Sequence, residues 1–337
     1  MKIFNKAAVF ADLHLGKKHN SVQFNEDSEQ FILWFIEEAK KWNADSVIFC
    51  GDWHDNRRNI NISTLNYSLR CMEHIDKNFD QWYFIPGNHD LYYKDKRDLS
   101  SIEIARNLKN CTIIRDPVTI GDVSFVPWLV EDEWKSIKSI KSKYIFGHFE
   151  LPYFLMNQMF EMPDNGGLNK DSFKNVEYVF TGHFHKRQNK NNVYYIGSPF
   201  PQTFSDVWDD ERGMMFLEWD KEPEFKKWPF APKFRTINLS SLLEKPNEYI
   251  DDKTYAKVNI DLNLKYDEIQ FIKELYMEYF DPREFIMIPA SKNQNYNEDY
   301  DTEISFKNIE QIVIEGLNSV ESFTIDNKKL IEIYNSL

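Results

Sequence analysis

Carboxylate, amide and imidazole side chains directly follow several apolar runs of the sequence. Val47–Cys50 is followed at once by Gly51 and Asp52, which is typical of a buried strand that breaks into a tight loop. Taken alone, Asp52 could be a turn residue that caps the next helix. The same pattern recurs at four other places. The five places together contribute Asp12, His14, Asp52, Asn88, His148, His183 and His185. This recurrence favours a functional site over a helix cap.

The mixture of these side chains predicts a class of metal. Carboxylate oxygen, amide oxygen and imidazole nitrogen together suit Mn²⁺, Fe²⁺ or Zn²⁺ better than Ca²⁺, and the lack of thiolates in the set argues against a structural zinc. Seven ligands exceed what one cation needs, so we expect two metals that share one carboxylate. Two metals ~3.5–4 Å apart can clamp the attacking and leaving oxygens of a phosphoryl displacement and generate hydroxide near neutral pH. His89 is then free to act as an acid, and Asp90 could orient it.

Alternating strands and helices must position these residues. Apolar runs predict strands at Ala7–Phe10, Val47–Cys50, Trp82–Ile85, Thr112–Ile114, Tyr144–Phe146, Tyr178–Phe180 and Val193–Ile196. Apolar residues at helical spacing predict helices over about Glu26–Trp42, Ser63–Asn78 and Ser100–Leu108. Asp12 and His14 are two residues apart in extended backbone and so point to the same side. We therefore expect a layered α/β sandwich whose strand ends carry the polar set.

The sequence changes character after Asp220. We expect a main domain over residues 1–220, a small α+β cap domain over 221–290, a linker over 291–305 and a helical tail over 306–337. Three prolines between Glu222 and Pro232 indicate the first boundary, and the nearly apolar-free stretch Ser291–Glu303 is typical of a flexible linker. In the tail, one predicted helical face carries Ile309, Ile312, Val313 and Leu317.

Composition limits the class of protein. The formal net charge of −13 argues against a general nucleic-acid coat but leaves room for local basic patches. Three cysteines, two of them in apolar runs, are typical of reduced core residues in a cytoplasmic protein. No stretch approaches the ~18 apolar residues of a membrane span, and the first residues have the pattern of a strand rather than of a signal peptide.

The motifs D-x-H, G-D-x-x-D, G-N-H-D, G-H and G-H-x-H occur in this order between residues 1 and 220. In these motifs and their order, the chain resembles the calcineurin-like metallophosphoesterase superfamily. Within it the chain resembles the SbcD-type nuclease subunits of double-strand-break repair complexes, and above all the recombination endonuclease subunits of T-even-like phages. This narrower likeness depends on the motif ADLHLG, the Gly-Ser-Pro turn after GHFH, a small cap and a helical tail after a linker. The implied fold is an α/β, two-layered β-sandwich flanked by helices.

The resemblance also implies a role for each matched residue. The first metal would be bound by Asp12, His14, Asp52 and His185, and the second by Asp52, Asn88, His148 and His183, with Asp52 bridging. His89 would be the catalytic histidine that assists the leaving oxygen. The implied cofactor is a pair of Mn²⁺ ions, with Mg²⁺, Fe²⁺ or Zn²⁺ as alternatives. His54 departs from the family pattern, and we favour a packed imidazole over a group that supports a ligand.

Basic residues follow the motif loops and are expected at the mouth of the site. They are Arg57, Arg58, Lys186 and Arg187 and, after the third motif, Lys94, Lys96 and Arg97. Charge runs are usually solvated faces, but the shared placement of these residues beside the site favours contacts with substrate phosphates.

These observations lead to a functional hypothesis: a Mn²⁺-dependent DNA exonuclease and single-strand endonuclease of a bacterial or phage-infected cytoplasm. The resemblance implies a homodimer built through the nuclease domain and an SbcC-type, SMC-like ATPase that binds the tail helices. The chain has no G-x-x-x-x-G-K-[ST] motif, so the partner would supply the ATPase. Two alternatives stay open: a stand-alone metallophosphatase or small-nucleotide phosphodiesterase, and a non-catalytic scaffold for the ATPase. The tail helices could also simply cover the core.

Overall fold

The computed structural model describes residues 1–156, 160–164, 166–289 and 328–329 of the 337-residue chain. The chain divides into two compact units, Met1–Ala290 and Ser291–Leu337, and almost all of the described residues belong to the first. The predicted linker and all but two residues of the predicted tail lie outside the described residues. Within the described part of the chain, every helix is too short or too polar to cross a membrane.

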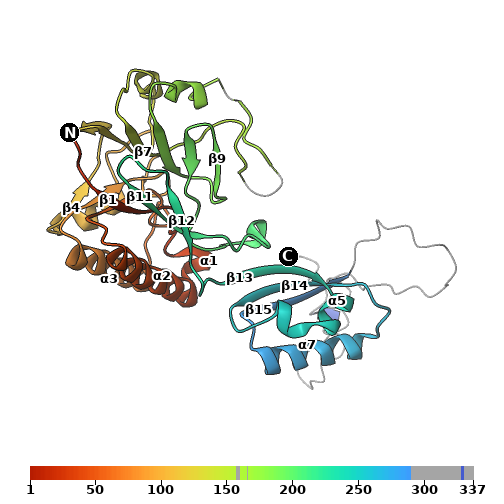
Figure 1. Cartoon of the computed structure of the whole chain (residues 1–337). Coiled ribbons are helices and arrows are strands. Elements are labelled where there is room, and N and C mark those ends of the chain that lie inside the picture. The colour runs from red at the N-terminus through yellow and green to blue at the C-terminus, as the bar shows by residue number, and fades with distance from the viewer. Residues whose placement is uncertain (157–159, 165, 290–327, 330–337) are drawn as a thin grey trace. The chain divides into compact units, whose positions relative to one another are not determined.

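Two six-stranded sheets form the larger part of this unit (Figure 1). The first has the order β12-β11-β1-β2-β3-β4, with β1 Lys6–Phe10, β2 Ser46–Cys50, β3 Trp82–Ile85, β4 Cys111–Ile113, β11 Gly213–Glu218 and β12 Glu224–Lys227. The second has the order β5-β6-β7-β8-β10-β9, with β5 Val118–Ile120, β6 Val123–Val126, β7 Tyr144–His148, β8 Tyr178–Gly182, β9 Gln188–Lys190 and β10 Val193–Tyr195. In each sheet the central strands run parallel, as βαβ connections require.

Alternation along the strands builds a core on both faces of the first sheet. Ala7 and Val9 of β1 share a buried cluster with Phe125 and Phe146 of the second sheet. Their neighbour Phe10 belongs instead to a cluster with helix residues on the opposite face. Because successive side chains of a strand point to opposite faces, one sheet can pack against the other sheet and against helices at once. The expected two-layered sandwich flanked by helices is therefore confirmed.

Two long helices, α2 (Val22–Lys41) and α3 (Ile62–Asn78), lie side by side on the outer face of the first sheet (Figure 1). α2 begins four residues before the predicted Glu26, because the side chain of Ser21 accepts a hydrogen bond from the Phe24 backbone N–H and caps the helix there. Asn61 caps α3 in the same way. Ser101–Asn107, where a helix was also expected, is a 3₁₀ helix.

Shorter elements complete the sandwich. They are α1 Lys17–Asn20 and α4 Trp134–Ile137 and the 3₁₀ helices at Lys170–Phe173 and Phe204–Asp206. α4, the first of these 3₁₀ helices and the intervening loops cover the outer face of the second sheet, where Phe149, Leu151 and Phe173 pack against β7, β8 and β10.

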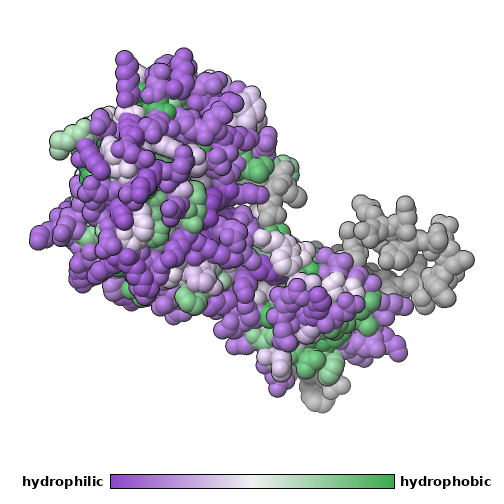
Figure 2. All heavy atoms as spheres, viewed as in Figure 1, coloured by the Kyte–Doolittle hydropathy of each residue, from purple (hydrophilic) through white to green (hydrophobic). Residues whose placement is uncertain are grey.

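A separate parallel sheet follows, in the order β13-β14-β15, with β13 Lys233–Asn238, β14 Thr254–Ile260 and β15 Glu284–Pro289. It packs against α5 (Leu239–Glu244) and α7 (Tyr266–Phe280), next to the short α6 (Pro246–Tyr249). Apolar surface gathers over α7 (Figure 2), where Phe271 is 65% exposed. β12 falls within the range expected for the cap domain but pairs with β11 in the first sheet, so the separate sheet starts only at Lys233.

Candidate metal centre

The predicted ligands all lie at or just beyond the carboxyl ends of five strands. They are Asp12 and His14 after β1, Asp52 after β2, Asn88 after β3, His148 at the end of β7, and His183 and His185 after β8. Six of these ligands, together with the predicted acid His89, form three overlapping groups whose ligand atoms lie within 4.8 Å of one another: Asp12, His14 and His185; His14, Asp52 and His89; Asp52, His148 and His183. Both sheets thus contribute to one cluster at one edge of the sandwich.

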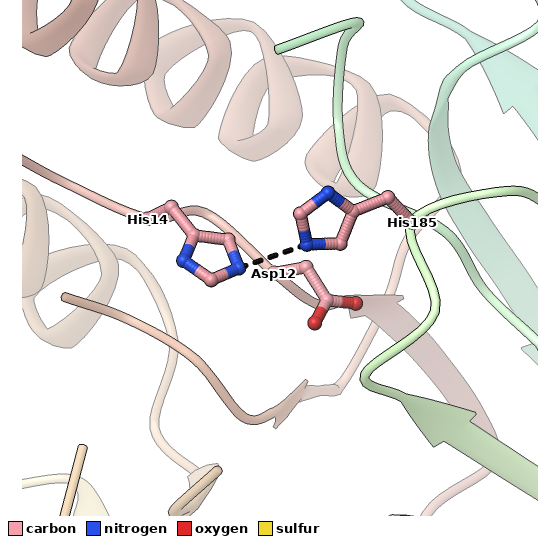
Figure 3. Close-up of side chains that lie close together, drawn as sticks. All are labelled: Asp12, His14 and His185. Carbon is pink, nitrogen blue, oxygen red and sulfur yellow. Dashed lines mark hydrogen bonds between the residues drawn. The ribbon is translucent and has the colours of Figure 1, made fainter. Parts of the chain in front are cut away.

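The first group joins Asp12 and His14 with His185 of the other sheet (Figure 3). The Nε2 atoms of His14 and His185 face each other at 3.0 Å. Burial lowers the pKa of His14 to about 4 and holds the pKa of His185 well below its usual value, so both rings are neutral at neutral pH. Oδ2 of Asp12 is buried and has no hydrogen-bond partner among the described residues. An unpartnered carboxylate oxygen beside two neutral imidazoles fits a bound cation.

Asp52 connects this group with the other ligands. Its Oδ2 lies 3.6 Å from Nε2 of His14 and 3.3 Å from Nε2 of His148. Oδ1 of Asn88 lies 3.1 Å from the same His148 nitrogen and 3.0 Å from Nδ1 of His183. The Asp52 carboxylate therefore stands between two sets of nitrogen and oxygen donors, an arrangement that fits a pair of cations.

The outer ring nitrogens of His148 and His183 are held by acceptors. Nδ1 of His148 lies 2.8 Å from the Cys50 carbonyl oxygen, and Nε2 of His183 lies 3.3 Å from the Glu150 carboxylate. Carbonyl and carboxylate oxygens accept hydrogen bonds, so these nitrogens carry protons and the opposite nitrogens face the cluster. Orientation of this kind fixes the tautomer in which imidazole binds a metal.

Asp55 and Glu150 received no role from the sequence, although both lie within or beside a motif. Oδ1 of Asp55 lies 3.4 Å from Nδ1 of His14 without hydrogen-bond geometry, whereas the Glu150 carboxylate is hydrogen-bonded to Nε2 of His183. Asp55 closes the motif G-D-x-x-D, and Glu150 is the second residue after His148. The sequence signal that could have identified both residues is a carboxylate inside a ligand motif or within two residues of a ligand.

Close backbone approach requires glycine within the motif loops. Gly51 has φ +94°, and a Cβ there would lie 2.3 Å from Nδ1 of His148. A Cβ at Gly87 would lie 2.2 Å from Oδ1 of Asp52. Asp12 and Asp52 themselves have φ values of 55° and 63°, so the chain accepts left-handed backbone at these aspartates where their carboxylates enter the cluster.

The structure gives Asp90 a role other than the expected orientation of His89. Oδ2 of Asp90 accepts hydrogen bonds from the backbone N–H groups of Asp52 and Gly87, each at 2.9 Å. Its Oδ1 accepts from the backbone of Trp53 and His54 at 3.0 and 3.2 Å. This buried carboxylate therefore joins two motif loops, because the N–H groups of both loops converge on it.

His89 is oriented by the Asp55 backbone instead. Its Nδ1 lies 2.5 Å from the Asp55 carbonyl oxygen, and its ring centroid is 4.9 Å from that of His14. Since a carbonyl oxygen accepts, Nδ1 carries the proton and Nε2 is the nitrogen that can gain or release one. A half-buried ring with this orientation is suited to act as a general acid. The ligand atoms of His89, His14 and Asp52 also lie within 4.8 Å of one another, so His89 could alternatively bind a metal.

The surroundings of His54 match the packed imidazole that we favoured from the sequence. The ring is buried between Ser101 Oγ, 2.8 Å from Nδ1, and Ser68 Oγ, 2.9 Å from Nε2. Burial lowers its pKa to about 3, so the ring is neutral.

The basic residues expected at the mouth differ in their surroundings. Arg97 is not free for phosphate, because it pairs with Glu133 and Asp116 and donates to the Trp128 carbonyl oxygen. The Arg187 guanidinium lies 4.5 Å over the ring of Phe225, which packs it against β12. The remaining residues include the exposed Arg58 and the half-buried Arg57 and Lys186, whose contact with substrate stays a prediction.

Comparisons with known proteins identify a family and several relatives of this chain. A model of the family described as calcineurin-like phosphoesterase matches residues 6–187. The chain is 25% identical over 354 residues to exonuclease subunit 1 of Enterobacteria phage T4, an alignment that covers 100% of this chain and 98% of that protein. It is 26% identical over 255 residues to the SbcD subunit of the SbcCD nuclease of Staphylococcus epidermidis, covering 62% of this chain and 64% of the relative.

Two solved structures give weaker matches. A dimetal phosphatase from Danio rerio matches with 12% identity and a TM-score of 0.43, over 66% of this chain and 95% of that one. The nuclease MPE of Pseudomonas putida matches with 16% identity and a TM-score of 0.30, over 54% of this chain and 62% of that one.

Proposed function

The chain belongs to the calcineurin-like phosphoesterase family, and on that premise we propose that it is the nuclease subunit of a DNA break-processing complex. It is a metal-dependent hydrolase of phosphate esters. The single observation that carries the proposal is the position of Asp52, whose Oδ2 lies within 3.6 Å of ring nitrogens from both ligand groups. A shared carboxylate between two donor sets fits a two-metal phosphodiesterase better than a single-ion site.

Two cations would be held by the residues that the structure brings together. Asp12, His14 and His185 would hold one, Asn88, His148 and His183 the other, and Asp52 would bridge. Bound there, the cations would supply Lewis-acid charge to the phosphoryl oxygens and lower the pKa of an attacking water. Carboxylate, amide and imidazole donors suit Mn²⁺, with Mg²⁺, Fe²⁺ and Zn²⁺ as alternatives.

His89 would serve the leaving oxygen. The Asp55 carbonyl holds the proton on Nδ1, so Nε2 is the atom that would deliver a proton. Asp90 would act by keeping the two motif loops together rather than by touching the substrate.

The relatives' names support nuclease activity and membership of a multi-subunit protein. Both curated relatives are named as nuclease or exonuclease subunits, and the phage T4 protein aligns over all of this chain. We propose that the substrate is DNA, cut by exonuclease and single-strand endonuclease action, and that an SMC-like ATPase binds the C-terminal tail. A homodimer through the nuclease domain is part of the same proposal.

The purified protein tests this function directly. Linear duplex DNA and circular single-stranded DNA are incubated with Mn²⁺ or Mg²⁺, beside an Asp52→Ala control. Mn²⁺-dependent cleavage that the control lacks is the expected result. Intact DNA together with hydrolysis of bis-p-nitrophenyl phosphate would favour a small-substrate phosphodiesterase. If neither substrate is hydrolysed even with the ATPase added, the chain is a scaffold.

A further inference from the structure

A pocket of about 410 Å³ opens beside His148, next to the ligand group of the second cation. Two indole rings, Trp128 and Trp134, line it together with Leu129, Phe149 and Leu168. A volume of this size holds a small planar ligand. The sequence analysis singled out none of these residues. Trp128 and Leu129 follow β6, Trp134 begins α4, Phe149 follows β7, and Leu168 lies in the loop before the 3₁₀ helix at Lys170.

The pocket is joined to the metal centre through ring contacts. The centroid of the Trp128 ring lies 5.1 Å from that of His183 and 6.0 Å from that of His148. A group seated against Trp128 therefore lies one ring away from two of the predicted ligands.

The charges at the pocket do not suit a phosphate. Two carboxylates, Glu131 and Glu150, line it, and none of its described lining residues is lysine or arginine. Carboxylates repel phosphate but accept hydrogen bonds from the N–H and amino groups of bases. Indole rings offer a stacking surface for any base. The pocket thus suits a nucleobase, while the neighbouring cations suit the phosphate.

Trp128 is held in place before any ligand arrives. Its backbone N–H donates to the Pro86 carbonyl oxygen at 2.9 Å, and its own carbonyl accepts from Arg97 at 2.8 Å. Arg97 is in turn paired with Glu133. These bonds fix the backbone, and the contacts with His148 and His183 hold the indole ring, so the wall loses little conformational freedom on binding.

We propose that this pocket takes an unpaired base of the DNA strand being cut, from the nucleotide that carries the scissile phosphate or from the one beside it. This inference rests on the proposed nuclease function and specifies its substrate contact. A base within a duplex is stacked and paired, so it must leave the stack to reach the pocket. Cleavage is therefore favoured at single-stranded or frayed positions.

The test compares a single-stranded oligonucleotide with copies in which one nucleotide at or beside the cleaved bond is abasic. Wild-type protein and Trp134→Ala are measured on both substrates, because Trp134 lines the pocket while Trp128 also packs against ligand rings. Trp134→Phe retains a stacking ring. Phe230→Ala is the matched control, since this aromatic residue is 59% exposed and does not line the pocket.

The expected result is a coupled loss. Removing the base lowers kcat/KM of the wild-type protein roughly 10-fold, and Trp134→Ala lowers it similarly on the intact strand. Trp134→Ala on the abasic strand lowers kcat/KM no further than either change alone. Trp134→Phe retains most of the activity, and Phe230→Ala behaves as the wild type. Unchanged cleavage of every abasic strand by the wild-type protein overturns the inference even if Trp134→Ala fails to fold, and so do losses that multiply. Absence of DNA cleavage by the wild-type protein overturns the proposed function itself.

Discussion

The Asp90 carboxylate accepts a hydrogen bond from the backbone N–H of Asp52 at 2.9 Å, although the two residues belong to different motif loops. It accepts three further backbone N–H groups, from Gly87, Trp53 and His54. The residue that carries the shared carboxylate of the metal centre is therefore held by a second, buried carboxylate that does not reach the cluster itself.

Asp90→Asn should destabilise the protein by about 3 kcal/mol, because one side-chain oxygen is replaced by an amino group that faces buried N–H donors. The free energy of unfolding from urea denaturation measures this change, and bound metal should fall with it. Asp132→Asn, an exposed carboxylate paired with Lys135, is the control. A stability equal to that of the wild type would show that the four hydrogen bonds do not hold the loops.

Asp52→Ala should remove both metals, whereas Asp12→Ala should remove one. Among the described residues, the Asp52 carboxylate lies within 3.6 Å of ring nitrogens of both His14 and His148, while Asp12 occurs in the first ligand group. Atomic emission spectrometry of dialysed protein gives the metal content per chain, with His74→Ala, a half-buried histidine of α3 outside the ligand groups, as control. Equal losses in the two variants would contradict the bridging role of Asp52.

His89→Asn should retain both metals and lose about 10²–10⁴-fold in kcat, the contribution of a positioned acid. The amide can still donate to the Asp55 carbonyl, but the proton-transferring Nε2 is gone. Metal content and the rate of DNA cleavage are measured on the same sample. Loss of one metal would instead make His89 a ligand, which its group with His14 and Asp52 allows.

The ligands were predictable because a short rule places them: polar residues that follow parallel strands meet at one sheet edge. The rule says nothing of backbone N–H directions, so the role of Asp90 could not be found from its place beside His89. Arg97 was expected at the mouth, but its partner Glu133 lies 36 residues away and only the fold brings the two together. The edge strand β12 was assigned to the cap domain because prolines flank it on both sides and its residues are mostly charged.

Removal of residues 306–337 should abolish binding of the SMC-like ATPase while cleavage by the isolated subunit continues. The reason is the apolar face predicted at Ile309, Ile312, Val313 and Leu317, which suits a groove in a partner. Light scattering of mixtures with the ATPase measures the complex. Val313→Asp should weaken it and Glu315→Gln should not. An unchanged complex after the truncation would refute the docking role of the tail.

Gly51→Ala should cost far more than Gly166→Ala, although both glycines have left-handed backbone with φ +94° and +77°. At Gly166 an added Cβ meets nothing within 4 Å, so only the backbone preference counts, about 1–2 kcal/mol. At Gly51 the Cβ would lie 2.3 Å from Nδ1 of His148 and would push that ring off the Cys50 carbonyl. We therefore expect Gly51→Ala to lose metal as well as stability, and Gly166→Ala to keep its metal. Urea denaturation and metal content measure both effects, and similar values for the two variants would show that the close approach at His148 does not constrain the site.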